Sequence, residues 1–251
     1  MKKNTALVTG GGSGIGFAVA SRLSEAGYRV VLAGRTEDRL KAATASLSGA
    51  SIIQMDVTSE ASVANAFEKL AASKKLPDIL VNNAGAAITA PLEHTSTVAW
   101  EQMMGVNLTG AFFCSRAALP YMKEKGFGRI ITVASTAGLK GYAYTSAYTA
   151  AKHGVVGLMR AMAQELAASG VTANAVCPGF TDTDIVKEAV TNIVSKTNRS
   201  SDDALRELIR NNPAKRLVSP DEVAATVLWL CSAEASAING HALAVDCGET
   251  A

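Results

Sequence analysis

The chain lacks the features that mark zinc-binding, redox-active and disulfide-stabilised proteins. Its four cysteines, Cys114, Cys177, Cys231 and Cys247, lie far apart, form no C-x-x-C pair and have no histidine at ligand spacing. This pattern argues against a zinc or thiol-redox site. It is typical of small buried side chains in a reducing compartment. We therefore expect no metal to be bound.

Long hydrophobic runs are also missing. After Met1 and two lysines, the apolar stretch 6–8 stops at Thr9, and is shorter than the roughly 7 to 15 residues of a signal-peptide core. No stretch reaches the roughly 18 apolar residues that a membrane span needs. We expect a cytoplasmic protein without a membrane partner.

Neither sign of charge is in large excess. The 24 Lys and Arg residues against 22 Asp and Glu give a net charge of +2, which predicts no affinity for nucleic acid. The six prolines are scattered, and neither a linker nor an internal repeat is visible. With 251 residues, of which 48% are hydrophobic, the chain can bury a substantial core. A single domain over residues 1–251 is expected.

Short β-branched runs alternate with longer helical patterns, which is typical of βαβ units around a parallel sheet. We expect seven strands, at about 5–9, 29–33, 51–56, 78–82, 129–134, 172–177 and 242–245. We expect helices at about 14–26, 37–47, 59–73, 97–125 and 146–169. A last helix starts after Ser219, since an N-capping serine precedes Pro220 and two acidic residues. The fold class is therefore α/β, a doubly wound, three-layer α/β/α sandwich.

Tyr148 and Lys152 are the first candidate catalytic pair, because residues four apart share one face of a helix. An ammonium group near a phenol favours the ionised phenol and lowers its pKa from about 10 toward neutrality. A carbonyl reduction needs an acid of this kind. A Tyr-x-x-x-Lys spacing also arises by chance on a helix with a solvated lysine.

A glycine cluster follows the first expected strand and precedes a helix. The pattern Thr-Gly-x-x-x-Gly-x-Gly is met by Thr9, Gly10, Gly14 and Gly16, whereas G-x-G-x-x-G fits at no offset. Glycines let the backbone approach a pyrophosphate whose charge lies at the helix N-terminus. A flexible turn is the alternative interpretation.

The ordered set of motifs resembles the short-chain dehydrogenase/reductase family along essentially the whole chain. The set comprises residues 9–16, 82–85, Asn107, Ser135, the Tyr148 and Lys152 pair, and Pro178-Gly179. The resemblance is strongest to the branch of 3-oxoacyl-ACP and acyl-CoA reductases, 3-hydroxyacyl-CoA dehydrogenases and polyketide ketoreductases. It implies a Rossmann-type sheet with strand order 3-2-1-4-5-6-7 and a nicotinamide dinucleotide cofactor.

The resemblance also implies roles for the catalytic residues. Tyr148 would be the general acid in reduction and the general base in oxidation. Lys152 would hold the nicotinamide ribose and keep the phenol acidic, together with the positive ring of an oxidised cofactor. Ser135 would donate to the carbonyl oxygen, and Asn107 would anchor a water that links Lys152 to solvent. Turn-capping and packing roles are the alternatives for Ser135 and Asn107.

The implied cofactor contacts are spread over the ends of several strands. They are Gly10, Ser13, Gly14, Ile15, Gly16, Arg35, Thr36, Asp56, Val57, Asn83, Ala84, Gly85, Tyr148, Lys152, Pro178, Gly179 and Thr183. Asp56 would contact the adenine, or equally would cap the turn after its strand.

The end of the second expected strand bears on the choice of cofactor. An acidic residue there would bind the ribose of NAD, but this chain has Arg35 and Thr36. Arginine offers a fork to a phosphate, so NADP(H) is favoured over NAD(H). Arg35 stacking on adenine, with Glu37 or Asp38 reaching the ribose, is the alternative.

The segment at about 183–213 is expected to be a substrate lid with helical pieces at 184–194 and 202–210. Its basic residues would attract the phosphates of an acyl thioester or would simply be solvated. They are Lys187, Lys196, Arg199, Arg206, Arg210, Lys215 and Arg216. The expected reaction is hydride transfer between NADP(H) and a ketone or secondary alcohol, most of all a 3-oxoacyl thioester.

Two alternatives stay open at this point. One is an NAD-dependent 3-hydroxyacyl-CoA or other secondary-alcohol dehydrogenase, and the other is a non-catalytic regulator that senses dinucleotides. The resemblance also implies a homotetramer. A small-residue face at Ala147, Ala151, Gly154, Gly157 and Ala161 would allow close helix approach.

Overall fold

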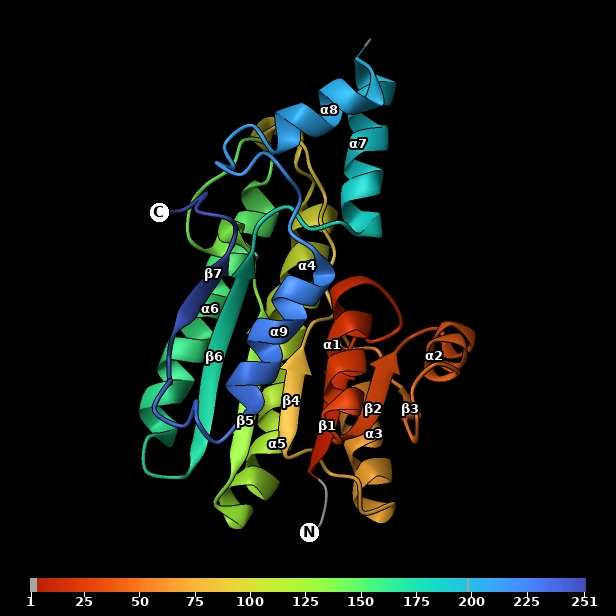
Figure 1. Cartoon of the computed structure of the whole chain (residues 1–251), viewed down its shortest axis with the longest axis vertical. Helices are drawn as coiled ribbons and strands as arrows, with labels where there is room; N and C mark the ends of the chain where they lie inside the picture. The colour runs from red at the N-terminus through yellow and green to blue at the C-terminus, as the bar shows by residue number, and fades with distance from the viewer. Residues whose placement is uncertain (1–3, 198) are drawn as a thin grey trace.

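Seven parallel strands form one sheet in the order β3-β2-β1-β4-β5-β6-β7 (Figure 1). The computed structural model describes residues 4–197 and 199–251. The strands are β1 (Thr5–Thr9), β2 (Arg29–Gly34), β3 (Ser51–Gln54), β4 (Ile79–Asn82), β5 (Gly128–Val133), β6 (Val171–Pro178) and β7 (Ala242–Val245). This arrangement confirms the expected fold class and strand order.

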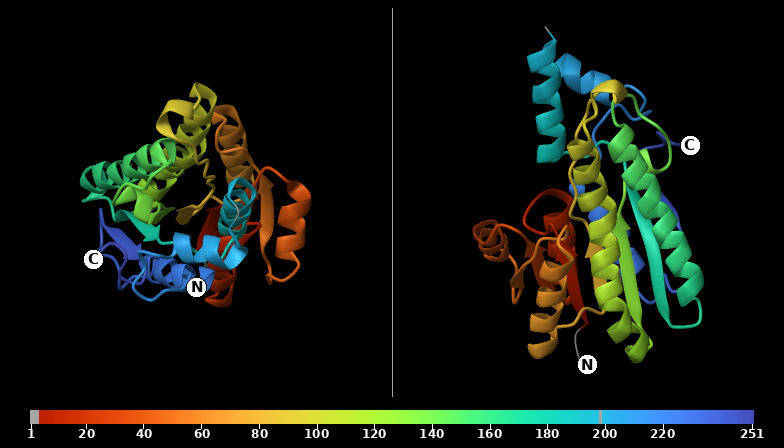
Figure 2. Two further views of the ribbon diagram at one scale, coloured as in Figure 1. Left: turned by 90° about the horizontal axis from the view of Figure 1, so that it is seen from above. Right: turned by 180° about the vertical axis from the view of Figure 1, so that it is seen from behind.

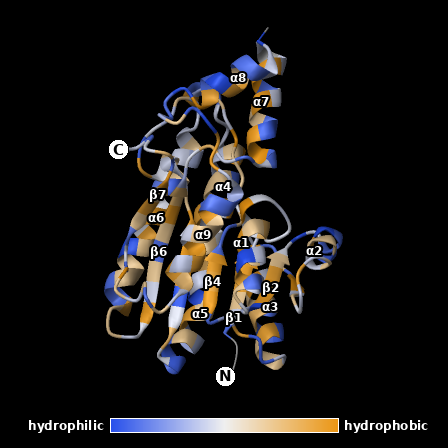
Figure 3. Ribbon diagram, viewed as in Figure 1, coloured by the Kyte–Doolittle hydropathy of each residue, from blue (hydrophilic) through white to orange (hydrophobic). Residues whose placement is uncertain are grey.

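Helices cover both faces of the sheet, as the end-on view in Figure 2 shows. The helices α1 (Gly14–Glu25), α2 (Glu37–Thr44) and α9 (Pro220–Cys231) bury their apolar residues on one face. The helices α3 (Glu60–Ala72), α5 (Gly110–Lys125) and α6 (Ser146–Leu166) do so on the other. Figure 3 shows the strands as largely hydrophobic and the outer helix surfaces, α2 especially, as more hydrophilic. Strands buried on both faces explain the continuous apolar runs in the sequence.

The helix expected at 97–125 is interrupted. It runs as α4 (Thr97–Met104), a π-helical turn (Gly105–Thr109) and α5. The Asn107 amide donates to the backbone oxygen of Met103 at 3.1 Å and to that of Ala86 at 2.9 Å. A side chain that enters the helical ladder in this way is a known cause of such a bulge. The bulge holds Asn107 at a fixed point below the carboxyl edge of the sheet.

Several other boundaries shift for local reasons. Strand β3 ends at Gln54, before Asp56, because that carboxylate accepts from the backbone and the hydroxyl of Thr58 at 2.9 and 2.8 Å. Helix α9 begins as expected, with Ser219 and Glu222 forming a reciprocal capping box. Short 3₁₀ turns at Leu92–His94 and Thr136–Gly138 were not expected.

The segment after β6 forms two helices, α7 (Asp184–Lys196) and α8 (Ser201–Leu208). Both stand above the carboxyl ends of the strands, at the top of Figure 1. The helical pieces expected within 183–213 are therefore present. In an open parallel sheet this edge is where ligands bind.

Candidate active site

The glycine loop between β1 and α1 has the backbone that the sequence predicted for a phosphate cradle. Gly10 and Gly14 have positive φ angles of 63° and 53°, which favour glycine. A Cβ on Gly16 would lie 2.4 Å from both the Gly10 oxygen and the Asn83 side-chain nitrogen. Ser13 is the N-cap of α1 but makes no side-chain cap bond. The first N–H groups of α1, which have no intrahelical partner, are thus available to an anion.

The turn after β4 supports this loop from beside it. The Thr9 hydroxyl accepts from the backbone N–H groups of Asn83 and Ala84, each at 3.0 Å. The Asn83 amide donates to the backbone oxygens of Thr9 and Gly10 at 2.9 and 3.3 Å. The Asn83 side chain and backbone N–H are therefore used in holding the loop, which leaves its backbone oxygen for any cofactor contact. Asn82 donates to Ser115 and Thr132, inside the sheet.

Two arginines lie where β2 ends. Arg35 directly follows β2 and is exposed. Arg39, which the sequence pattern did not single out, lies against the glycine loop, because a Cβ on Gly12 would be 3.0 Å from its Cγ. Glu37, an alternative ribose ligand, forms an ion pair with Lys41 at 2.7 Å. Within residues 4–197 and 199–251, neither arginine has a carboxylate within 4.0 Å.

The predicted adenine contacts follow β3. One oxygen of Asp56 caps the turn through Thr58, so the turn-capping role is present. Val57 is buried and packs against Gly110, where an added Cβ would lie 2.9 Å from its side chain. Ile15 likewise packs partly into the core. For Val57, the backbone is what remains for a cofactor, whereas the Ile15 side chain stays partly exposed.

The predicted nicotinamide contacts are Pro178, Gly179 and Thr183, which lie between the end of β6 and the start of α7. The Gly179 N–H donates to the Val245 oxygen at 3.1 Å, which fixes the turn after Pro178 to β7. Thr183 is the N-cap of α7. A Cβ on Gly14 would lie 3.3 Å from the Thr183 methyl group. The lid therefore starts directly beside the phosphate cradle.

Ser135, Tyr148 and Lys152 come together at the ends of β5 and α6. Lys152 is 5% exposed, and its ammonium lies 5.6 Å from the centre of the Tyr148 ring. It donates to the Val133 backbone oxygen at 2.9 Å. The Ser135 side chain lies near Tyr148, and its hydroxyl accepts from the Ala137 N–H at 3.1 Å, which caps the turn after β5. The three side chains predicted to be catalytic are therefore close together.

The electrostatics differ from the sequence-based expectation. Burial raises the pKa of Tyr148, and the nearby Ser135 side chain opposes the rise only in part. Burial also lowers the pKa of Lys152 from 10.5 to about 8. From the sequence, we expect the ammonium charge to outweigh desolvation. In the structure, desolvation is the largest cause of both pKa shifts, because Lys152 is buried and Tyr148 is partly buried.

Asn107 lies next to this group. It is buried, with an exposed fraction of 3%. A Cβ on Gly85 would lie 2.9 Å from the Asn107 side-chain oxygen and 3.7 Å from the Lys152 ammonium. The four predicted catalytic residues thus lie around one small volume, with the Gly85 turn as its wall.

The remaining tyrosines and histidines take no place in this group. The Tyr142 hydroxyl bonds to Thr136 at 2.7 Å and to Glu249 at 2.5 Å. Tyr144 is 65% exposed, with a positive φ of 66°. His153 is exposed and contacts the Thr149 oxygen. Glu249 was missed because nothing in its local sequence marks a buried carboxylate.

Most basic residues of the lid are already paired. Arg206 contacts Asp203 at 3.3 Å, and Arg199 and Arg210 contact Glu207 at 3.7 and 3.1 Å. Arg216 contacts Glu222 at 2.7 Å. Lys187 is exposed, Lys215 donates to the Arg210 backbone, and the Lys196 side chain lies outside the described residues. The pairing favours a solvated lid surface over a dedicated phosphate site.

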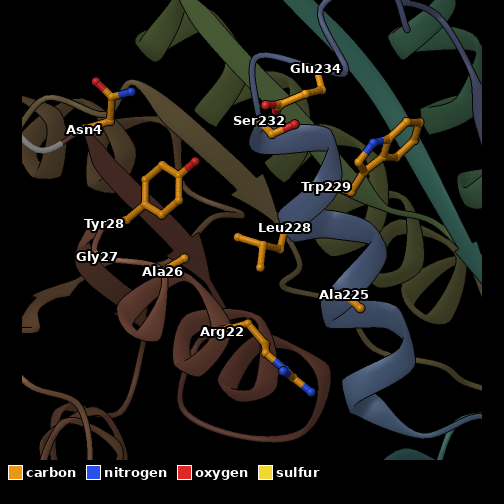
Figure 4. Close-up of a pocket in the computed structure, with 10 residues that line it drawn as sticks. All are labelled: Asn4, Arg22, Ala26, Gly27, Tyr28, Ala225, Leu228, Trp229, Ser232 and Glu234. Atoms are coloured by element: carbon orange, nitrogen blue, oxygen red, sulfur yellow. The ribbon is translucent and has the colours of Figure 1, made fainter.

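A shallow hollow between α1 and α9 lies at the opposite, amino edge of the sheet. Figure 4 shows Arg22 and Tyr28 on one side and Leu228, Trp229 and Glu234 on the other. It contains none of the predicted site residues. No group of three or more potential metal ligands occurs in the part of the chain that the structure describes. Among those same residues, no helix combines the length and hydropathy that crossing a bilayer requires.

The small-residue face of α6 is partly internal. Ala147 and Ala151 are buried, and a Cβ on Gly154 would lie 2.9 Å from Leu108. Only Gly157 and Ala161 are exposed. Much of this face therefore serves packing within the chain, contrary to its interpretation as a subunit contact.

Comparisons with known proteins agree with this geometry. Residues 10–250 match the family model described as Enoyl-(Acyl carrier protein) reductase. The chain is 36% identical over 254 residues to D-beta-hydroxybutyrate dehydrogenase of Rhizobium meliloti (strain 1021), with 98% of each chain covered. It is 35% identical over 244 residues to acetoacetyl-CoA reductase of the same organism, with 97% of each covered.

A solved structure is similar along the whole fold. A single-substitution variant of actinorhodin polyketide ketoreductase, solved with NADPH, is 34% identical and has a TM-score of 0.95, with 99% of this chain and 97% of that chain covered. The glycine cradle, the Tyr148 and Lys152 pair and these similarities lead to one assignment. The chain belongs to the short-chain dehydrogenase/reductase family and is an NAD(P)-dependent oxidoreductase that acts on ketones or secondary alcohols.

Proposed function

We propose that the protein reduces a ketone with NADPH, and that the ketone is a 3-oxoacyl thioester or a similar ketone without a free carboxylate. The observation that carries the proposal is the cluster of Ser135, Tyr148 and Lys152 beside the glycine cradle. It brings together an acid, a hydrogen-bond donor and a cation at one edge of the sheet.

The bound cofactor would supply the hydride, and the protein would manage one proton. Tyr148 donates its phenolic proton to the carbonyl oxygen, and its raised pKa keeps it protonated before that step. Ser135 donates a hydrogen bond to the same oxygen as negative charge develops there. Lys152, next to the Gly85 turn, holds the ribose, and Asn107 orders the path for a replacement proton.

The choice of NADPH rests on the end of β2. Arg35 is exposed at the end of β2, and the aliphatic part of the Arg39 side chain lies against Gly12 of the glycine loop, while Lys41 pairs with Glu37 at 2.7 Å. A ribose 2′-phosphate gains charge-assisted hydrogen bonds from such a site, whereas a bare 2′-hydroxyl does not. The similar ketoreductase structure, which is described with NADPH, supports this choice.

The choice of a thioester rests on the loop after Ser135. Between Thr136 and Thr145 the sequence has one cationic side chain, Lys140. Its ammonium is paired with the buried Glu249 carboxylate at 3.2 Å. A free 3-oxo acid would bring an unpaired carboxylate to this loop, whereas a thioester brings none. Similarity to acetoacetyl-CoA reductase agrees with this choice.

A second candidate is an NAD-dependent hydroxy-acid dehydrogenase. The similarity to D-beta-hydroxybutyrate dehydrogenase, at 36% identity, favours it. Such an enzyme requires a cation to bind the substrate carboxylate. The exposed Lys187 of the lid could serve, because it forms no ion pair within the described residues.

Two further features belong to the proposal. Residues 183–213 act as a lid on a single domain over residues 1–251, since α7 begins beside Gly14.

The protein forms a homotetramer. The exposed Phe112 on α5 and the exposed Gly157 and Ala161 on α6 offer a surface for it. Light scattering at micromolar concentration measures the mass directly, and a monomer contradicts the tetramer.

The deciding experiment is a panel of acetoacetyl-CoA, acetoacetate and a neutral cyclic ketone, each assayed with NADPH and NADH. We expect the highest kcat/KM with acetoacetyl-CoA and NADPH, and loss of turnover in Tyr148→Phe. Arg35→Asp should raise the KM for NADPH by about tenfold or more and leave that for NADH nearly unchanged, since one charge-assisted contact is lost. Preference for acetoacetate with NADH would establish the second candidate instead.

A further inference from the structure

Glu249 is a buried carboxylate in the segment 246–251 that follows β7. Its side chain is only 2% exposed. Asp246 fixes the backbone around it by accepting from the N–H groups of Gly248 and Thr250 at 3.0 and 2.9 Å. A carboxylate loses much hydration energy on burial, so its position depends on specific partners.

Those partners come from the loop that follows Ser135. The Tyr142 hydroxyl donates to one Glu249 oxygen at 2.5 Å, and the Lys140 ammonium lies 3.2 Å from the same oxygen. Lys140 also donates to the Glu249 backbone oxygen at 3.2 Å. Glu249 thus fastens two side chains of one loop to the end of β7.

The contact extends to the residue next to Ser135. A carboxylate only accepts, so the single phenolic proton of Tyr142 points to Glu249. The Thr136 hydroxyl, 2.7 Å from the Tyr142 oxygen, must then donate to it. Thr136 is buried and adjoins Ser135 in the chain. The chain of hydrogen bonds therefore runs from Glu249 through Tyr142 to the backbone that carries the carbonyl-binding serine.

The other side of Glu249 faces the nicotinamide turn. Its second oxygen is buried and has no hydrogen-bond partner in the part of the chain that the structure describes. A Cβ on Gly179 would lie 3.5 Å from that oxygen. The Tyr142 ring meets the Phe180 ring edge-on, with centroids 6.1 Å apart. Tyr142 and Phe180 thus join the loop after β5 to the turn after β6.

We propose that Glu249 is a positioning residue of the active site, which holds the 136–142 loop and the Tyr142–Phe180 pair in the geometry that binds the ketone. It touches neither substrate nor cofactor, and acts through Tyr142 and Thr136 on Ser135. The inference rests on the proposed role of Ser135 in binding the carbonyl oxygen. It makes the segment after β7 a determinant of ketone binding.

The test is a double-mutant cycle with Glu249→Gln, Tyr142→Phe and the double variant, all as full-length protein. Glu249→Gln keeps the side-chain shape and removes the charge. Thr250→Val is the matched control, because it removes a contact to Asp246 in the same segment without touching Tyr142. The readouts are kcat and KM for the best ketone, Kd for NADPH by fluorescence, and Tm.

We expect each single variant to lower kcat/KM by about tenfold, mainly through KM for the ketone, since a hydrogen bond to a charged group is lost. The double variant should lose little more than either single one, because both remove the same charge-assisted hydrogen bond between Tyr142 and Glu249. Kd for NADPH and the kinetics of Thr250→Val should stay within about twofold of wild type. The proposal would be overturned if the loss of kcat/KM in the double variant were the product of the two single losses. It would also be overturned if kcat/KM were unchanged in Glu249→Gln.

Hydrogen exchange separates this inference from the proposed function. In Glu249→Gln the amides of residues 136–142 should exchange faster, while those of the glycine loop should not change. This readout needs no turnover. Unchanged exchange overturns the inference even if the ketone assignment holds. Faster exchange in a protein that reduces no ketone supports the contact between Glu249 and the loop while the proposed function fails.

Discussion

Lys152 is a buried ammonium whose titration tests the proposed proton delivery. Burial lowers its pKa to about 8, whereas burial raises the pKa of Tyr148. Tyr148 therefore stays protonated throughout the range in which Lys152 loses its charge. The fall of kcat/KM for ketone reduction at alkaline pH must then come from Lys152.

The size of the effect follows from the pKa of about 8. At pH 7 about nine in ten Lys152 side chains are charged, and at pH 9 about one in ten. If the charged form is the active one, kcat/KM for reduction is level below pH 7 and falls about tenfold per unit above pH 8. Lys152→Arg, with a guanidinium that stays charged, should move the fall to higher pH.

Stability gives an independent readout with a definite sign. The pKa of Lys152 is about 8 when folded and 10.5 as the reference value for the unfolded chain. Between these values the folded state binds fewer protons, so the free energy of unfolding rises as the pH rises through this window. The whole gain is about 3 kcal/mol for one group. Lys152→Met should lack it.

The assays are kcat/KM for reduction from pH 6 to 10, by NADPH absorbance, and urea unfolding at pH 7.5 and 10 for wild type and Lys152→Met. The difference between the two proteins isolates Lys152 from the other lysines. An alkaline limb that begins above pH 10, or that is identical in Lys152→Arg, would refute the argument that desolvation controls this ammonium.

Three further substitutions test other parts of the structure. Gly16→Ala places a Cβ 2.4 Å from the Gly10 oxygen, so we expect Kd for NADPH to rise by at least about tenfold in a fluorescence titration. Gly141→Ala, whose Cβ meets nothing within 4 Å, should bind NADPH like wild type, and equal losses would contradict this. Asn107→Ala leaves the Ala86 backbone groups unpaired; kcat should fall, and urea unfolding should show a loss of about 1 to 3 kcal/mol. Full activity would argue against its role. Asp78→Ala removes a buried carboxylate that accepts from the Thr5 N–H at 2.8 Å and pairs with Lys125. This pair lies at the amino edge of the sheet, so we expect a loss of about 3 kcal/mol in unfolding with unchanged kcat/KM. A changed kcat/KM would show coupling across the sheet.

The sheet and most of its helices were predictable because each is specified by its local sequence. Strands such as β2 contain short apolar runs, and Ser219 with Glu222 marks the start of α9. Glycines such as Gly16, where no Cβ fits, mark the cradle. The spacing of Tyr148 and Lys152 predicted that both lie on one face of α6, as the proposed catalytic pair requires, since helical periodicity is a local property.

What only the tertiary structure decided depends on residues that are distant in the chain. The π-helical turn at Asn107 arises because Ala86, on another loop, accepts from its amide. Arg39 reaches the cradle only because α2 packs beside Gly12.

The electrostatics of the site have the same origin. The pKa of Tyr148 rises because surrounding elements remove water, and no spacing rule contains that cost. Glu249 meets Tyr142 although the two residues are 107 positions apart in the sequence. The sequence alone determined the fold and the choice of proposed reacting groups, because local patterns specify elements and motifs. Packing between elements determined the burial, and with it the charge, of those groups.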